Sequence, residues 1–287
     1  MGLLSLIGAA VTAAVVWDVF HTLWHPSGQG RLSHALMAFV WRLTRHLGGR
    51  LRRLAGPLAM ATVILAWASL VVIGGALVYW PHLPDAFSYG PGLDPGRGSL
   101  VVDALYVSMV TVTTLGFGDI VPTTPWLRLV APLQAMVGFA LLTAAVSWVL
   151  QVYPALTRRR TLSLRLATLE EAGMLEDLDK LTDVTAARIL DDLTASVAQI
   201  RVDLTQYTES YFFQESSRDA TLAVTIGYAH ELALAAEKSD RQDVHLASRR
   251  LLKALNDLAQ VLDEQFLHTD GSTSEVLAAY SAAQTDR

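Results

Sequence analysis

Two long runs of apolar residues constrain this chain more than any other feature of its sequence. They cover residues 58–80 and 129–153 and contain no charged side chain. Both exceed the roughly 20 apolar residues that a helix needs to cross a bilayer. A third run, residues 3–24, is of similar length but contains Asp18 and His21. The sequence therefore predicts three transmembrane helices.

The first of these runs leaves two alternatives open. It could be a signal peptide, but it lacks a basic leader and a small-residue cleavage site. We expect a retained helix, in which Asp18, His21 and His25 share one face at positions i, i+3 and i+7. Ionisable groups within a span are candidates for function, and these three could hold a divalent metal. Alternatively, Asp18 and His21 make hydrogen bonds across a helix interface.

Basic residues indicate how the chain is oriented in the membrane. Residues 26–56 contain arginines and no acidic residue, and Arg158, Arg159 and Arg160 follow the last apolar run. Cytoplasmic segments are enriched in Lys and Arg. We therefore expect a multi-pass protein of the plasma membrane, with its N-terminus outside and its C-terminus in the cytoplasm.

The basic segment at 26–56 also has apolar residues at helical spacing, with arginines opposite them. This pattern predicts an amphipathic helix on the inner membrane surface. Arg42 and Arg45 are three residues apart, as in a voltage sensor, but Gly48 and Gly49 interrupt the pattern. We therefore expect the surface helix.

A shorter apolar segment, residues 100–112, lies between the second and third long runs. It is too short to span and must enter from outside and turn back. Thr-Thr-Leu-Gly-Phe-Gly-Asp follows at 113–119. Glycines at alternate positions allow backbone dihedrals that other residues avoid, so successive carbonyls can point the same way. A ring of such carbonyls can replace the water around a potassium ion. The alternative is a glycine-rich turn between buried helices.

With these residues in place, the chain resembles the two-transmembrane-type potassium-channel pore, which has a single pore loop in each chain. The resemblance covers about residues 58–153 and is strongest at 103–122. It implies that Thr113 and Asp119 support a selectivity filter and that Gly138 is the gating hinge of the inner helix. The ion-binding residues that it implies are Thr114, Leu115, Gly116, Phe117 and Gly118.

Two features of the motif bear on selectivity and assembly. Phe117 stands where the family has Tyr, and lacks the hydroxyl that would brace the filter; potassium selectivity is still expected. One filter strand offers one carbonyl per layer, and the sequence holds no second copy of the motif. Four chains must then surround one axis, which predicts a homotetramer.

Residues 157–287 have the composition of a soluble helical domain, with 14 basic and 22 acidic residues. Two series of apolar residues there alternate steps of three and four, the heptad spacing of packed helices. They predict a bundle of three or four helices, in which each seam is plain core or is shared among four chains. The series are Ala186, Leu190, Leu193, Val197, Ile200, Leu204 and Tyr207, and Val244, Ala247, Leu251, Ala254, Leu258 and Val261.

Together these features predict an all-α integral membrane protein. Its potassium-channel-like pore domain has three transmembrane helices plus a re-entrant pore helix, and a cytosolic α-helical bundle follows. The expected segments are an N-terminal transmembrane helix at 1–25, a cytoplasmic amphipathic basic helix at 26–56, a pore domain at 57–156 and a cytosolic helical domain at 157–287.

The expected function is passive, potassium-selective conduction through the filter. The alternatives are a non-selective cation channel of the same architecture and a membrane-anchored signalling or scaffold protein. No nucleophile–base pattern indicates an enzyme, and potassium is the only ligand expected. Hydrophobic residues make up 52% of the chain and charged residues 17%, which is unlike a nucleic-acid-binding protein. The expected partners are the lipid bilayer and an unidentified cytosolic regulator.

Overall fold

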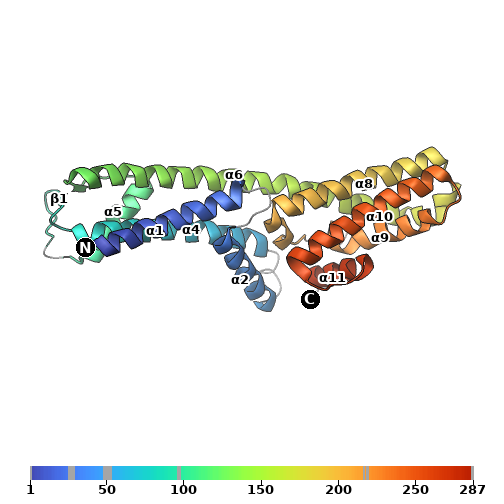
Figure 1. Ribbon diagram of the computed structural model, residues 1–287, viewed down its shortest axis with the longest axis horizontal. Coiled ribbons are helices and arrows are strands. Elements are labelled where there is room, and N and C mark those ends of the chain that lie inside the picture. Colours follow the sequence, from blue (N-terminus) through green and yellow to red (C-terminus); the bar gives the residue numbers. More distant parts are fainter. Residues whose placement is uncertain are drawn as a thin grey trace. The chain divides into compact units, whose positions relative to one another are not determined.

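The computed structural model describes residues 2–24, 30–47, 54–95, 98–215, 217 and 220–285. It is mostly helical, with two strands of three residues each in this described part (Figure 1). The all-α membrane fold predicted from the sequence is confirmed. Of the residues singled out above, His25, Gly48 and Gly49 lie outside the described residues, as does the side chain of Arg45.

The chain divides into two compact units. Unit 1 comprises Met1–Phe39 and Ala59–Leu150, and unit 2 comprises Val40–Leu58 and Gln151–Arg287. The helices α2, α4 and α6 each contribute residues to both units.

Within the described residues, three helices are long and apolar enough to cross a membrane. They are α1 (Gly2–Trp24), α4 (Ala55–Tyr79) and α6 (Pro125–Glu171). The chain is thus a multi-pass membrane protein. The helix α6 is continuous for 47 residues and runs through Pro154, which directly follows its apolar half. It carries the three consecutive arginines well before its end.

Helix α2 (Arg31–Leu47) has three different faces. Met37 and Trp41 are buried, whereas Phe39 and Leu43 are 62% and 49% exposed. Arg42 is exposed on a third face. The exposed apolar face is the one that the sequence assigned to the inner membrane surface, and that placement stays a prediction.

The segment between α4 and α6 forms a small cap with its own core. The strands β1 and β2 pair antiparallel, with Tyr89 opposite Ile120. Tyr79 of α4, Phe87 of β1 and Leu127 of α6 are buried together in this core. Strands of three residues are too short to show the alternation of apolar and polar residues from which a strand is predicted. The elements of this segment are η1 (Trp80–His82), β1 (Phe87–Tyr89), α5 (Leu100–Val112) and β2 (Ile120–Pro122).

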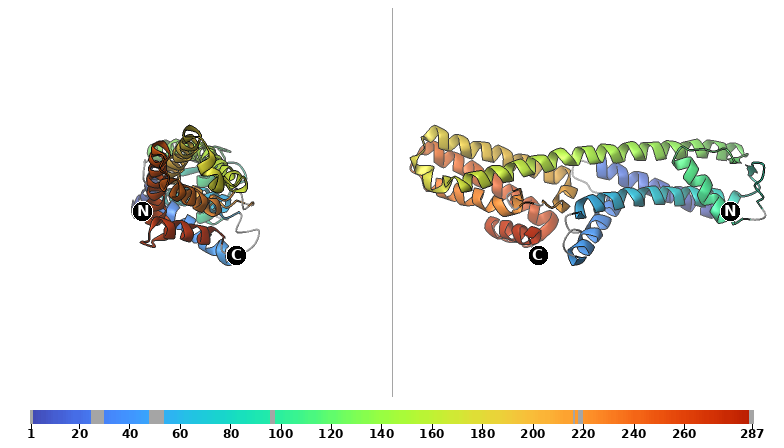
Figure 2. Two further views of the ribbon diagram at one scale, coloured as in Figure 1. Left: turned by 90° about the vertical axis from the view of Figure 1, so that its right-hand side faces the viewer. Right: turned by 180° about the vertical axis from the view of Figure 1, so that it is seen from behind.

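Beyond α6, unit 2 is a bundle in which α8 and α10 run side by side (Figure 2). Thr182 caps the N-terminus of α8 by accepting a hydrogen bond from the backbone of Thr185, as short hydroxyl side chains commonly do. The remaining elements are α7 (Met174–Asp177), η2 (Leu178–Lys180), α8 (Asp183–Gln206), η3 (Thr208–Phe212), α9 (Leu222–Glu237), α10 (Gln242–Leu262), η4 (Asp263–Leu267) and α11 (Thr273–Thr285).

The two predicted heptad seams are core within this chain. Every member of the first seam from Ala186 to Leu204 is buried. In the second seam Val244, Ala247, Leu251 and Leu258 are buried as predicted, but Leu255 and Leu262 are buried in place of Ala254 and Val261. A straight helix drifts by about 20° per heptad from a strict seven-residue repeat. The buried face of α10 therefore passes to the next residue towards its C-terminal end.

Leu193→Ala should lower the free energy of unfolding by about 2–5 kcal/mol, the usual cost of a cavity at a fully buried leucine. Leu193 lies in the α8 seam and is 0% exposed. Denaturant unfolding of the full-length protein in detergent, followed by circular dichroism, measures the change. Leu246→Ala is the control, because Leu246 on α10 is 52% exposed and should change stability by less than about 0.5 kcal/mol. Equal effects would contradict this account of the core.

Candidate functional site

The glycine motif begins where α5 ends. The backbone N–H of Thr113 donates to the carbonyl of Met109 and closes the last turn of the helix. The N–H groups of Leu115 and Gly116 then both donate to the carbonyl of Val110, at 2.9 and 3.1 Å. The chain therefore leaves α5 in a tight turn that is held by backbone hydrogen bonds.

Every second residue of the motif has a left-handed backbone. The φ angles are 56° at Thr114, 51° at Gly116 and 77° at Gly118, and the two residues between them do not share this conformation. Alternating the hand of successive residues turns their carbonyls towards a common side. Threonine rarely takes a positive φ, which costs about 1–2 kcal/mol relative to the right-handed form. The alternation thus extends to a residue that is not glycine.

The motif is exposed in the single chain. Residues 113–118 are all exposed, with Leu115 at 57% and Phe117 at 66%. They follow the C-terminus of α5, where the helix dipole places a partial negative charge. Exposed carbonyls beside this end of a helix form an environment that favours a cation.

Asp119 fixes the far end of the motif. Its Oδ2 accepts a hydrogen bond of 2.5 Å from the hydroxyl of Tyr106 on α5. Its backbone carbonyl accepts a second one, of 2.7 Å, from the N–H of Gly90 beside β1. The first contact ties Asp119 to α5, and its role as a filter support stays a prediction. Both ends of the motif are therefore tied to the same helix.

Gly138 lies against the end of α5 rather than at a break in α6, which is helical on both sides of it. A Cβ atom at this position would lie 2.0 Å from the carbonyl oxygen of Val112. Only glycine permits so close an approach between the two helices. The hinge stays a prediction, and the structure gives Gly138 a packing role in addition.

Three polar residues that the sequence analysis did not single out connect α4, α5 and α6. The Tyr79 hydroxyl donates to Gln134 Oε1 at 2.6 Å, and Gln134 Nε2 donates to the Ser108 hydroxyl at 2.7 Å. Ser108 in turn donates to the carbonyl of Val72 at 2.6 Å. A glutamine inside an apolar run was the available signal, because a buried amide needs partners.

Asp18 is buried among hydrogen-bond donors from neighbouring segments. Its Oδ2 accepts from Ser33 at 2.6 Å and from Trp67 Nε1 at 2.9 Å, and its Oδ1 accepts from the N–H of Leu32 at 3.0 Å. Among the residues that the structure describes, no group of three or more metal-ligating side chains occurs. The contacts of Asp18 match the alternative of a helix-interface residue, and the divalent site with His21 stays a prediction.

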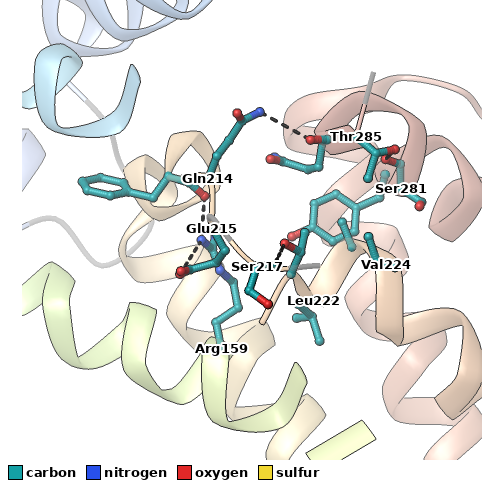
Figure 3. Close-up of a pocket in the computed structure, with 13 residues that line it drawn as sticks. Arg159, Gln214, Glu215, Ser217, Leu222, Val224, Ser281 and Thr285 are labelled. Carbon is teal, nitrogen blue, oxygen red and sulfur yellow. Dashed lines mark hydrogen bonds and ion pairs between the residues drawn. The ribbon is translucent and has the colours of Figure 1, made fainter. Parts of the chain in front are cut away.

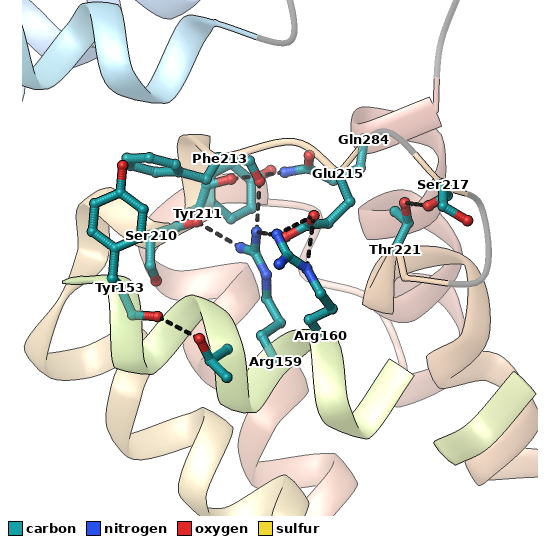
Figure 4. Close-up of polar contacts among 11 residues, drawn as sticks. Tyr153, Arg159, Arg160, Ser210, Tyr211, Phe213, Glu215, Ser217, Thr221 and Gln284 are labelled. Atoms are coloured by element: carbon teal, nitrogen blue, oxygen red, sulfur yellow. Dashed lines mark hydrogen bonds and ion pairs between the residues drawn. The ribbon is translucent and has the colours of Figure 1, made fainter. Parts of the chain in front are cut away.

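The three arginines of α6 belong to unit 2 and make ion pairs within it; Figure 4 shows the pair of Arg160 with Glu215. Arg158 donates from Nε and Nη2 to the two carboxylate oxygens of Asp203 on α8, at 2.8 and 2.6 Å. Arg160 donates from Nε and Nη2 to Oε2 of Glu215, at 3.1 and 2.7 Å. A movement of α6 would therefore involve the bundle as well.

Comparison with known proteins gives the same reading of the pore segment. The family model of ion channels matches residues 66–153, which include the motif and the α5–α6 contact. The chain carries an ion-channel domain. The two-pore potassium channel 5 of Arabidopsis thaliana is 45% identical over 56 residues, which are 18% of this chain and 14% of that protein.

Two further relatives extend the comparison. The two pore potassium channel c of Oryza sativa subsp. japonica is 43% identical over 87 residues, 29% of this chain and 18% of its own length. An uncharacterized membrane protein of Bacillus subtilis, YdjJ, is 27% identical over 166 residues, 57% of this chain and 48% of its own length. The chain thus spans about half of the Bacillus protein and under a fifth of either plant channel. No solved structure matches it.

Gly138→Ala should destabilise the ion-channel domain by roughly 1–3 kcal/mol, the usual cost of overpacking. The added methyl group meets the Val112 backbone, which cannot move aside as a flexible side chain can. Thermal unfolding of the full-length protein in detergent measures the change as a lower midpoint.

Gly227→Ala is the matched control, because Gly227 also lies within a helix, α9, but an added Cβ there meets nothing within 4 Å. It should be neutral or stabilising by up to about 1 kcal/mol. Similar losses in both variants would show that helix packing is not the reason for Gly138.

Proposed function

We propose that this protein is a passive potassium-selective channel and not an enzyme. The backbone carbonyls from Thr114 to Gly118 replace the hydration shell of the ion. The observation that carries the proposal is the alternation of left-handed residues in this segment, directly after the C-terminus of α5. This conformation is costly for Thr114 and needs a compensating interaction, which a cation on the carbonyls supplies.

We further propose that four copies assemble around the filter. One chain provides one carbonyl in each layer, whereas enclosing the ion takes several. Along α6, apolar side chains more than half exposed in the single chain recur every three or four residues, as one face of a helix does. This face is available to pack against neighbouring copies. Its residues are Leu129, Leu133, Met136, Phe139, Leu142 and Val146.

Selectivity for potassium rests on the motif and on the names of the plant relatives. Two of the relatives are named as potassium channels, and the motif at 114–118 differs from the TVGYG filter only in Leu115 for Val and Phe117 for Tyr. The proposed location is the plasma membrane, with the N-terminus outside. The basic residues of α2 and of α6 then face the cytoplasm. Gly138 is proposed as the hinge of the inner helix, and unit 2 as the site of regulation.

Gly116→Ala should abolish potassium flux and leave assembly intact. An added Cβ at Gly116 meets no atom within 4 Å, so the effect comes from the backbone, whose φ of 51° is unfavourable for alanine. The carbonyl then turns away from its neighbours. Flux into liposomes that contain the purified protein should fall at least about tenfold, while the tetramer content in detergent stays unchanged.

The matched control is Leu115→Val, which leaves the left-handed residues Thr114, Gly116 and Gly118 unchanged and should conduct. Reversal potentials of the wild type in mixed sodium and potassium test selectivity in the same system. A potential near zero would identify a non-selective cation channel. Selective flux through an assembled Gly116→Ala variant would reject the filter. A cellular role that survives this substitution would favour a scaffold.

Removing residues 161–287 should leave a tetramer that conducts with an altered open probability. The cut falls within α6 after its apolar run, so the apolar part of each span and the filter motif are kept, but the partners of Arg158 and Arg160, Asp203 and Glu215, are lost. A bundle coupled to the pore by about 1–3 kcal/mol shifts occupancy by roughly five- to 150-fold. Single-channel recording measures open probability, and gel filtration measures assembly. Loss of tetramers with unchanged gating in the remainder would show that the bundle only assembles the channel.

A further inference from the structure

Unit 2 contains a cavity that takes no part in the proposed ion conduction. It has a volume of about 500 Å³, within the range of about 300–1,000 Å³ typical of small-molecule sites. Figure 3 shows its walls, which are formed by Arg159 of α6, Glu215 after η3, Leu222 at the start of α9 and Ser281 of α11. Elements far apart in the sequence thus meet around one space.

The charge of Arg159 is buried beside this cavity. Arg159 is 5% exposed, and its Nη1 and Nη2 each donate at 2.6 Å to a backbone carbonyl, of Ser210 and Phe213 respectively (Figure 4). Both acceptors are neutral. A buried cation is costly unless an anion compensates for it. The two neutral carbonyls do not compensate for the charge of Arg159.

Glu215 compensates only in part for the charge of Arg159. Its Oε1 is 4.0 Å from Nη2 of Arg159, beyond the length of a hydrogen bond. Its Oε2 accepts both hydrogen bonds of Arg160. The charge of Glu215 is thus largely balanced by Arg160, and the three groups together carry a net positive charge.

A second donor lines the cavity without a partner of its own. Tyr280 on α11 is 3% exposed, and within the described part of the chain its hydroxyl makes no hydrogen bond. Burial raises the pKa of this hydroxyl above its ordinary value, against a smaller opposing effect of the Arg159 charge. The group therefore stays protonated at neutral pH and can donate.

The N-terminus of α9 is a third part of the cavity wall that favours negative charge. Leu222, Ala223 and Val224 of its first turn all line the cavity. The N-cap residue Thr221 does not cap this turn with its side chain, because its hydroxyl donates to the carbonyl of Ser217 instead. The first turn of a 16-residue helix favours an anion.

We propose that this cavity binds a phosphorylated small molecule of about the size of a nucleoside monophosphate. Its phosphate lies near Arg159, Tyr280 and the start of α9. A phosphate offers acceptor oxygens in several directions, as these three walls require, whereas a carboxylate is planar. The volume exceeds what a bare phosphate fills, and Leu222 and Val224 provide apolar contacts for the rest of the molecule.

Such a ligand would also regulate conduction, a consequence that rests on the proposed channel function. Arg159 belongs to the helix that carries the proposed hinge, and the opposite wall belongs to α9 and α11. A ligand that bridges these walls stabilises one arrangement of α6 against the bundle, and it shifts gating only if the two states bind it differently.

Binding is tested on the full-length protein in detergent by thermal unfolding and by titration calorimetry. The probes are adenosine monophosphate and ribose 5-phosphate, with adenosine, ribose and inorganic phosphate for comparison. At least one phosphate ester should raise the unfolding midpoint by several degrees, while its unphosphorylated counterpart and inorganic phosphate should not. The absence of any shift in the wild type would overturn the proposal.

Three variants locate the site. Tyr280→Phe removes only the hydroxyl and should weaken the Kd about tenfold, the loss of one hydrogen bond to a charged group. Ser281→Phe fills the cavity and should abolish binding. Ala282→Phe is the matched control, because Ala282 is exposed and does not line the cavity. Binding that is unchanged in both Tyr280→Phe and Ser281→Phe would place the ligand elsewhere and reject this site.

Flux into liposomes with and without the bound ester then tests regulation separately. A change of at least twofold in the wild type that Tyr280→Phe reduces supports the regulatory consequence. Binding without any change in flux rejects regulation alone. A wild type that binds the ester but conducts no cation rejects the channel function and leaves the binding site standing.

Discussion

The buried hydrogen-bond chain from Tyr79 through Gln134 and Ser108 to the Val72 carbonyl is the interaction on which the rest of the ion-channel domain depends. In lipid, a polar group without a partner costs several kcal/mol, so each link requires the next. The chain fixes α5 between α4 and α6. The motif that follows α5, with Asp119 at its far end, takes its position from that helix. The relation between the motif and the spans is therefore set by side chains that never touch the proposed ion path.

The sequence predicts those parts of the fold that are set by periodicity or by long apolar runs. The three spans follow from hydropathy, and the α8 seam follows from a heptad pattern whose members from Ala186 to Leu204 are all buried. The left-handed conformation of Gly116 and Gly118 could also be anticipated, because alternate glycines allow backbone dihedrals that other residues avoid; their use as an ion filter stays a prediction. In each case a single chemical preference, repeated over many residues or very specific, decides the outcome.

The parts that could not be predicted depend on tertiary contacts. The shift of the α10 seam to Leu255 reflects the geometry of a straight helix, which a strict heptad count does not contain. Nothing local shows that Gln134 finds Tyr79 and Ser108, or that the Gly138 backbone meets Val112. Asp18 illustrates the opposite case. Its presence in an apolar helix suggests a ligand site, but its two oxygens accept hydrogen bonds from Ser33, Trp67 and the start of α2.

In the proposed filter, the left-handed backbone of Thr114 has a consequence for the response to a bound ion. A glycine there would remove the conformational cost of about 1–2 kcal/mol but would also remove the hydroxyl. With threonine, the unoccupied segment sits above its local energy minimum, and a bound cation provides the compensation. Ion binding and the backbone conformation of Thr114 are then thermodynamically linked. The free energy of ion binding therefore includes the cost of holding Thr114 in the left-handed conformation. Removal of potassium should therefore let the Thr114 peptide rotate towards its preferred conformation. A spectroscopic change at this carbonyl would show the rotation.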